Sequence, residues 1–114
     1  MRRVGIVGGG PAGMVAGIAP GEAGGEVLLL GGEEKLGKKL YITGKGRCNV
    51  TNAAPPEEFL RGYARNGRFL HSAFANLTNE DLMRRIEGAG VPLKVERGGR
   101  VFPVSDKASD ITRA

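Results

Sequence analysis

Residues 4–13 read V-G-I-V-G-G-G-P-A-G, and this stretch decides the fold of the chain. A β-prone run from Arg3 to Val7 leads directly into the spacing G-x-G-x-x-G, and helix-compatible residues follow it. A strand, a glycine turn and a helix in this order form the context that a dinucleotide-binding turn requires. We therefore predict a strand over residues 3–7 and a helix that begins at about Pro11.

The three glycines of this spacing have different functions. Gly8 allows the tight turn, Gly10 lets the backbone approach a pyrophosphate, and Gly13 lets the helix pack close to the strand. The N–H groups and the positive dipole end at the start of that helix would face the phosphates. Pro11 is tolerated in the first turn because its missing N–H would have no partner there. We expect a diphosphate to be bound by Gly8, Gly10, Pro11, Ala12 and Gly13.

The same stretch has two weaker interpretations. Gly9, Gly13 and Gly17 form a G-x-x-x-G ladder of the kind found in membrane helices, but a spanning helix needs about 20 mostly apolar residues. The basic N-terminus could open a secretory signal, but a glycine-rich turn is a poor apolar region for one. We therefore expect a cytoplasmic protein with no membrane partner.

Composition limits the class of protein. The 114 residues suffice for one domain, and the net charge of +5 suits an anionic ligand. The single cysteine excludes an intrachain disulfide and a cysteine-based metal cluster. No aromatic-rich stacking surface or zinc spacing supports nucleic-acid binding. We expect neither a metal nor a nucleic acid as partner, although a basic nucleic-acid binder stays an alternative.

The remaining elements follow from local patterns. Residues 26–30 read as a buried parallel strand that completes a βαβ unit over about 3–30, and Pro20-Gly21 should end or kink the helix before it. A basic, glycine-punctuated segment covers residues 33–52, and a helical and hairpin segment covers about 56–114.

Within residues 56–114 we predict a short helix over 56–63, helical spacing over 68–77, and a capped helix from Thr78 to Ala89 with Asp81 completing a capping box. Strands flank Gly98-Gly99 as a hairpin with a primed turn, and Ser105 caps a last helical segment. The core candidates are Phe69, Phe74 and Phe102, and His71 is a packing or surface residue.

Two further blocks make the chain similar to a known family. Residues 34–52 read E-K-L-G-K-K-L-Y-I-T-G-K-G-R-C-N-V-T-N, and residues 95–110 read V-E-R-G-G-R-V-F-P-V-S-D-K-A-S-D. Together with the first glycine turn, these blocks resemble the BaiN/RdsA-like family of NAD(P)/FAD-dependent oxidoreductases. The resemblance covers nearly the whole chain and implies the N-terminal part of an α/β, Rossmann-like FAD-binding domain.

The resemblance implies that residues 43–49 lie beside the flavin. The segment around them combines cations, flexible glycines and amide side chains, which suit phosphates and the edge of a flavin ring. The cations are Lys38, Lys39, Lys45 and Arg47, and the other candidates are Thr43, Gly44, Gly46, Cys48, Asn49 and Asn52. A solvated basic loop is the alternative, and Cys48 reads more simply as a small buried hydrophobe.

The adenosine end departs from the pattern. The acidic residue that bonds the ribose should stand about 20 positions beyond the glycines, and Gly31 occupies that position. Glu33 or Glu34 would have to replace it.

The function expected from this reading is redox chemistry carried by FAD, with hydride from NAD(P)H or from a small-molecule substrate. No catalytic side chain or metal ligand can be assigned. We expect the chain, as a portion of a longer enzyme, to hold FAD weakly and not to turn over substrate alone. A non-catalytic nucleotide-binding module is the alternative.

Overall fold

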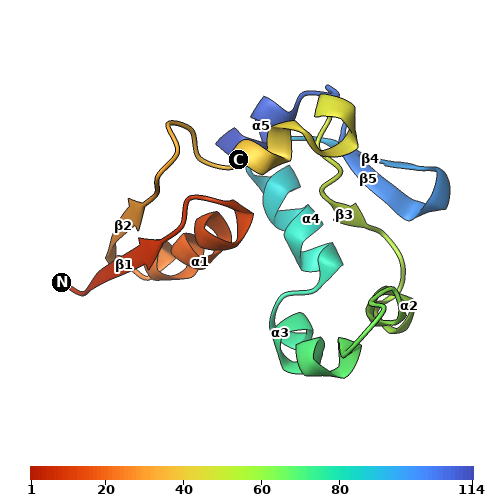
Figure 1. Cartoon of the computed structure of the whole chain (residues 1–114), viewed down its shortest axis with the longest axis horizontal. Helices are drawn as coiled ribbons and strands as arrows, with labels where there is room; N and C mark the ends of the chain where they lie inside the picture. The colour runs from red at the N-terminus through yellow and green to blue at the C-terminus, as the bar shows by residue number, and fades with distance from the viewer.

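The β-prone residues before the glycine turn and those after the first helix form a parallel pair of strands. The computed structural model describes all residues from Met1 to Ala114. Strand β1 (Arg3–Val7) leads to helix α1 (Pro11–Glu22) and then to strand β2 (Glu26–Leu30), as predicted (Figure 1). The strands pair in parallel with Val4 opposite Val27. This βαβ unit confirms the α/β reading of the N-terminal residues.

Helix α1 covers one face of this sheet. A Cβ built on Gly17 would lie 3.4 Å from Val27 Cγ1, so the helix backbone rests closely on the strand. The opposite face is exposed, with Leu28 at 59% and Leu30 at 51% exposure. The prediction that residues 26–30 are buried was therefore wrong. A parallel strand is buried when helices cover both faces, and here α1 covers only one.

Pro20 does not end α1. The helix continues through it to Glu22, and Ala23 forms the C-cap with its N–H bonded to Ala19 O. Pro20 lies in the last turn, where its missing N–H removes one helical hydrogen bond and few helical residues follow it. Its carbonyl oxygen accepts a hydrogen bond from the N–H of Gly25 at 2.9 Å. The sequence predicted that Pro20-Gly21 would end or kink the helix, and the early end was wrong because α1 continues to Glu22.

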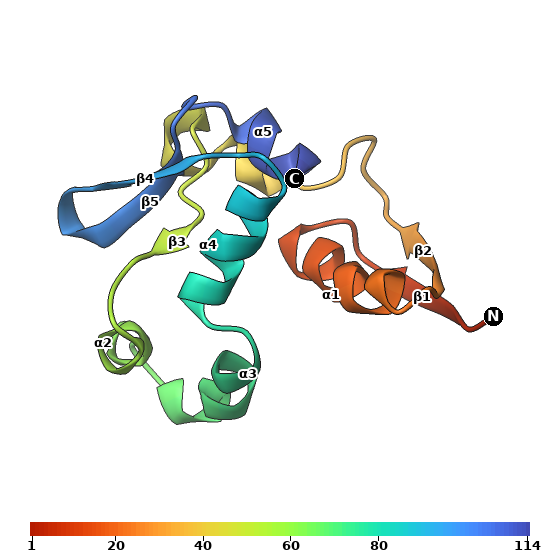
Figure 2. The same ribbon diagram turned by 180° about the vertical axis from the view of Figure 1, so that it is seen from behind.

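The second half of the chain consists of short helices around an antiparallel sheet. Its strands are β3 (Thr51–Asn52), β4 (Leu93–Glu96) and β5 (Arg100–Pro103), in the order β3-β5-β4. Its helices lie within segments that were predicted helical, except that η3 begins one residue earlier, and they are α2 (Pro56–Arg61), the 3₁₀ turn η3 (Gly67–Leu70), α3 (His71–Asn76), α4 (Asn79–Gly88) and α5 (Ala108–Arg113). Both views place α2 and α3 at the end of the molecule away from α5 (Figures 1 and 2). No helix is long and apolar enough to cross a membrane.

The start of α4 confirms the predicted capping box. Thr78 Oγ1 accepts a hydrogen bond from the Asp81 N–H at 3.1 Å, and the Thr78 N–H donates to Asp81 Oδ2 at 3.0 Å. Gly90 follows the helix with a φ of 94°, the left-handed conformation that suits glycine after a helix end.

Two predictions about the last elements were wrong in detail. The hairpin between β4 and β5 has a three-residue connection, the 3₁₀ turn η4 (Arg97–Gly99), because Glu96 pairs with Arg100 and leaves Arg97 in the loop. Ser105 does not cap α5: Lys107 is the N-cap, and Ser105 Oγ instead accepts from the Lys107 N–H at 3.2 Å in a local turn.

The core lies outside the βαβ unit. A buried cluster joins Cys48, Ile86, Ala108 and Ile111, and Phe102 of β5 is 1% exposed. Phe102 is therefore a core residue, as predicted. Phe69, at 86% exposure, is not, because the short turn η3 turns it away from the helices.

We expect Thr78→Ala to lower the free energy of unfolding at pH 7 by about 1 kcal/mol, since it removes the N-cap of α4. The backbone N–H of Thr78 lowers the pKa of Asp81 to about 2. The stabilising effect of Asp81 is therefore present above its unfolded value of about 3.9 and is lost as pH falls through about 2. Urea denaturation followed by circular dichroism at several pH values measures both effects. Thr112→Ala is the control, because Thr112 Oγ1 bonds within α5 without capping it, and an equal loss there would contradict the prediction.

Candidate functional site

The turn between β1 and α1 requires glycine where it was predicted. Gly8 has a φ of 113° and donates its N–H to Leu30 O at 2.7 Å, which ties the turn to the end of β2. A Cβ built on Gly13 would lie 1.9 Å from Gly8 O. Because real Cβ atoms do not approach a carbonyl oxygen so closely, only glycine at position 13 allows α1 to begin here.

Gly10 is different, because nothing in the protein occupies the space beside it. A Cβ built there would meet no atom within 4 Å, and its φ of −78° is accessible to any residue. Gly10 is the N-cap of α1, no side chain caps this end, and the first turn holds no acidic residue. The free N–H groups of the first turn, including that of Ala12, and the helix dipole thus face an open space, which fits the approach of a diphosphate.

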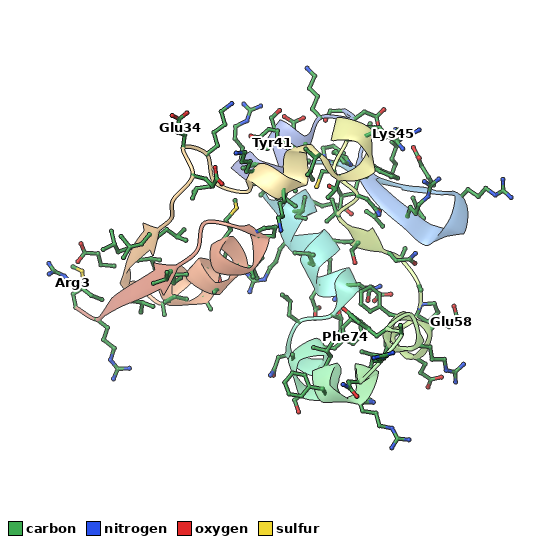
Figure 3. All side chains as sticks on the ribbon, in the orientation of Figure 1. Arg3, Glu34, Tyr41, Lys45, Glu58 and Phe74 are labelled. Atoms are coloured by element: carbon green, nitrogen blue, oxygen red, sulfur yellow. The ribbon has the colours of Figure 1, made fainter.

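The residues after β2 pass close to this turn. A Cβ on Gly31 would lie 3.3 Å from the backbone nitrogen of Gly9. Glu33 Oε2 forms an exposed ion pair with Lys38 Nζ at 2.9 Å, so both candidates already have a partner. Glu34 lies at the outer tip of the loop after β2 (Figure 3).

Gly37 is a residue of this region that the sequence analysis missed. It is buried with a φ of 66°, and its N–H donates to Gly9 O at 2.7 Å. A Cβ there would lie 3.1 Å from Met14 Sδ and 3.2 Å from Leu40 Cδ1. Its role depends on these long-range contacts, for which the local sequence contains no pattern.

The basic segment forms two 3₁₀ turns, η1 (Lys38–Tyr41) and η2 (Thr43–Gly46). A Cβ on Gly44 would lie 2.6 Å from Phe102 Cε1, so glycine here lets η2 pack against the core. Lys39 and Lys45 are exposed and form no ion pair, and Figure 3 shows Lys45 at the outer end of η2. Lys35 is likewise exposed and forms no ion pair, and its Nζ lies 5.9 Å from the centre of the Tyr41 ring, so these three lysines are the cations of the segment that are available to an anion.

Arg47 is held by the hairpin. Its Nη1 donates to Glu96 Oε1 at 3.1 Å and Oε2 at 2.9 Å, and reaches Asp106 Oδ1 at 3.5 Å. Its guanidinium carbon lies 3.9 Å from the centre of the Phe102 ring. Lys94 Nζ bonds to Asp106 as well, so two cations and two carboxylates form one network. Arg47 therefore fixes the end of η2 to β4 and β5.

The next two residues are enclosed. The Cys48 side chain is 0% exposed, and burial raises the pKa of its thiol, while a hydrogen bond with the Thr43 side chain acts in the opposite direction. Cys48 therefore stays protonated at neutral pH and packs as a small hydrophobe. Asn49 Oδ1 is buried without a hydrogen-bond donor. A buried acceptor of this kind costs free energy unless a partner supplies a donor.

A mainly apolar cleft of about 490 Å³ connects the glycine turn with the basic segment. Pro11 and Met14 of α1 line one side, and Leu40, Cys48 and Ile86 line the other. The structure thus brings Pro11 and Cys48 to one cleft, whereas the charged candidates of the segment do not line it.

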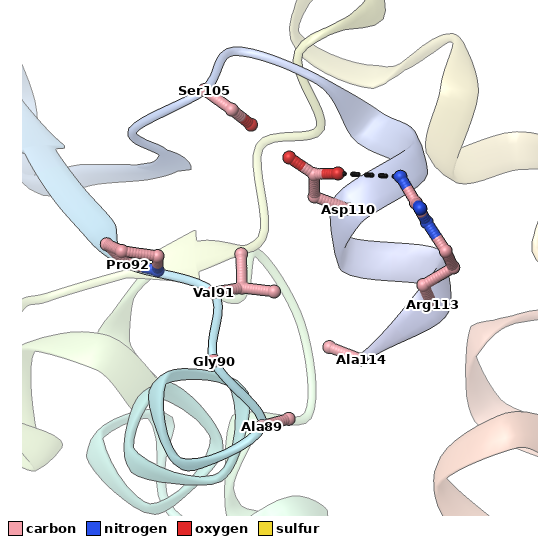
Figure 4. Close-up of a pocket in the computed structure, with 8 residues that line it drawn as sticks. All are labelled: Ala89, Gly90, Val91, Pro92, Ser105, Asp110, Arg113 and Ala114. Carbon is pink, nitrogen blue, oxygen red and sulfur yellow. Dashed lines mark hydrogen bonds and ion pairs between the residues drawn. The ribbon is translucent and has the colours of Figure 1, made fainter.

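A second hollow of about 320 Å³ lies between the end of α4 and α5 (Figure 4). Its charged pair is Asp110 and Arg113, which bond to each other at 3.0 Å within α5. None of the predicted site residues lines it.

We expect Arg47→Gln to release η2 from the hairpin, seen as faster amide hydrogen exchange over residues 43–48. The Arg47 guanidinium lowers the pKa of Glu96, and the Lys94 ammonium lowers that of Asp106. Because these carboxylate pKa values are depressed, the network keeps its charges at neutral pH and weakens only as pH falls below the ordinary carboxyl range, so strong acidification should also speed this exchange. Arg113→Gln breaks an exposed pair elsewhere and serves as control. Unchanged exchange in Arg47→Gln would contradict this role.

Comparison with known proteins extends these observations. A family model described as "HI0933-like protein Rossmann domain" matches residues 2–114. The chain is 34% identical over 113 residues to a 3-dehydro-bile acid delta(4,6)-reductase of Clostridium scindens, covering 97% of this chain and 27% of that protein. It is 35% identical over 107 residues to a ribosomal RNA dihydrouridine synthase of Escherichia coli, covering 93% of this chain and 26% of that protein.

A ribosomal RNA dihydrouridine synthase of Haemophilus influenzae is 30% identical over 98 residues, which cover 85% of this chain and 24% of the relative. The chain thus spans about a quarter of the length of the curated relatives it matches.

Proposed function

The chain belongs to the HI0933-like Rossmann-domain family of FAD-binding oxidoreductases, and from this premise we propose that it is the diphosphate-binding, N-terminal part of a flavoprotein oxidoreductase. The observation that carries the proposal is the open space at Gly10. The fold leaves no room for a side chain at Gly13. At Gly10, in contrast, a Cβ would meet no protein atom within 4 Å, so packing within the protein does not explain a glycine there. A ligand that needs close contact with the backbone accounts for Gly10.

In this proposal the residues of the turn hold the diphosphate. The N–H groups of Gly10, Ala12 and Gly13 donate to its oxygens, and Pro11 lacks an N–H that would compete. Lys39 and Lys45 supply positive charge from the basic segment, since neither is paired within the protein. Because the diphosphate is anionic, these two lysines also speed its approach.

The flavin side of the proposal rests on residues 43–49. When bound, FAD supplies the redox chemistry. Thr43, Gly46 and Asn49 present polar groups at this segment, and the buried Asn49 Oδ1 has no donor from the protein. Cys48 contributes an apolar wall that excludes water. Arg47 positions the segment through its ion pair with Glu96. Because Glu96 offsets its charge, Arg47 contributes little net charge near the flavin ring.

The names of the relatives suggest the direction of the reaction and two substrate classes. Both a reductase and a dihydrouridine synthase add hydrogen to their substrates, so we assign a reductive activity with NAD(P)H as the source of hydride. The substrate classes are a bile acid and a uridine base in RNA.

We expect Gly10→Ala to weaken FAD binding at least tenfold, because its methyl group occupies the space through which the diphosphate approaches. Its far-ultraviolet circular dichroism should stay unchanged. Gly5→Ala is the matched control, since a Cβ there also meets nothing within 4 Å and Gly5 is an exposed residue of β1 that does not line the cleft. Flavin fluorescence titration measures the affinity, and equal affinity in both variants would refute the diphosphate site.

Gly31→Glu should tighten FAD binding by about tenfold, because a carboxylate at the end of β2 would bond the ribose hydroxyls. The added Cβ lies 3.3 Å from Gly9 N, so the turn must yield by a few tenths of an ångström. Gly32→Glu adds the same charge one position later with open space around it, and it should give no gain. The same titration compares the two, and an equal effect would mean that charge alone is responsible.

A further inference from the structure

The segment of residues 56–76, here called the α2–α3 lobe, contains none of the residues proposed to bind FAD. It comprises α2, η3 and α3 and lies at the end of the molecule away from η2 and α5 (Figures 1 and 2). In Figure 3, Phe74 and Glu58 mark this lobe, while Tyr41 and Lys45 mark the opposite end. The α2–α3 lobe can therefore have a function of its own.

The lobe has an aromatic core that does not include Phe69. Phe59 of α2 stacks on Phe74 of α3 with ring centres 4.8 Å apart, and Tyr63 lies 6.3 Å from Phe59. These contacts hold α2 against α3. Phe69 has no aromatic partner and is 86% exposed, so it contributes nothing comparable to the packing of the lobe.

The backbone holds Phe69 in this outward position. Asn66 adopts a left-handed φ of 55°, and its carbonyl oxygen accepts the Phe69 N–H at 3.0 Å. A Cβ on Gly67 would lie 2.8 Å from Leu60 O, so η3 is pressed against the end of α2. A shallow hollow formed by Asn66, Gly67, Arg68 and Phe69 results at the surface. The ring is thus presented by a defined turn.

The lobe that carries the exposed ring also carries unpaired positive charge. Residues 59–77 contain three arginines and no acidic residue. Arg61, Arg65 and Arg68 are exposed and form no ion pair, although Glu57 and Glu58 stand in the first turn of α2. Elsewhere in the chain, five arginines are held in ion pairs, whereas Arg2, Arg97 and Arg100 form none; the paired ones are Arg3, Arg47, Arg84, Arg85 and Arg113. A single exposed Phe needs no explanation, but one that shares a surface hollow with Arg68, on a lobe with two further unpaired arginines, matches a polyanion with stacking bases.

We propose that the α2–α3 lobe binds single-stranded RNA, with a base stacked on Phe69 and phosphates contacted by Arg61, Arg65 and Arg68. Unpaired bases of RNA loops are recognised by aromatic rings and arginine planes, whereas double-stranded RNA hides them. The proposal selects RNA from the two substrate classes of the proposed function, and in that respect it rests on that function. It departs from the sequence-based expectation of no nucleic-acid partner, which rested on the lack of an aromatic-rich stacking surface and of a zinc spacing.

The test measures binding of the 114-residue chain to a fluorescently labelled, unstructured RNA of about 12 nucleotides by anisotropy, without FAD. Phe69→Leu keeps an apolar side chain and removes the stacking ring, and it should weaken binding about fivefold or more. Replacing Arg61, Arg65 and Arg68 together by Gln should reduce the slope of log affinity against log salt by roughly 2. Arg2→Gln is the control, because Arg2 is also exposed and unpaired but lies beside β1.

Unchanged affinity in Phe69→Leu would overturn the stacking site, and an equal loss in Arg2→Gln would show nonspecific charge attraction instead. A DNA oligonucleotide of the same sequence tests whether the lobe prefers RNA to DNA. Equal or tighter binding of DNA would overturn the assignment to RNA. Because no arm contains FAD, failure of RNA binding leaves the diphosphate site untouched. Loss of FAD binding in Gly10→Ala likewise leaves the RNA test unaffected.

Discussion

The close approach of α1 to the carbonyl oxygen of Gly8 is the constraint on which the rest of the structure depends. A side chain on Gly13 would need to occupy the position of that oxygen, so α1 can begin here only on a glycine. In the same turn Gly9 O accepts a hydrogen bond from the Gly37 N–H, and Gly37 packs against Met14 and Leu40. The steric requirement at Gly13 and the hydrogen bond at Gly9 together place the open end of α1 next to the start of the basic segment.

Ion pairs within the protein determine which cations of the basic segment can bind an anionic ligand. Lys38 and Arg47 are engaged by Glu33 and Glu96, and their charges largely offset those of the carboxylates. Lys35, Lys39 and Lys45 form no ion pair and keep their positive charges. The segment therefore has two structural cations and three available ones, so its attraction for an anion is weaker and more directional than its sequence suggests.

Patterns that act over a few residues were predictable from the sequence, and those that depend on distant contacts were not. The glycine turn and the Thr78 capping box each need only neighbouring residues, and both were identified correctly. The pairing of Arg47 with Glu96 joins residues 49 positions apart, and nothing local indicates it. Helical spacing likewise could not show that η3 turns Phe69 outward, because the contact between Gly67 and Leu60 determines that direction. The flavin-side residues stay a prediction.

The separation of the two proposed surfaces suits an enzyme that acts on one base of a large substrate. Binding energy from parts of the substrate remote from the reacting atoms can be used to hold the reacting part in place. A base must leave its stack before a flavin can reach it, and a strand anchored elsewhere makes that step less costly. Arginines and a rigid aromatic ring at the α2–α3 lobe would supply such an anchor without crowding the diphosphate turn.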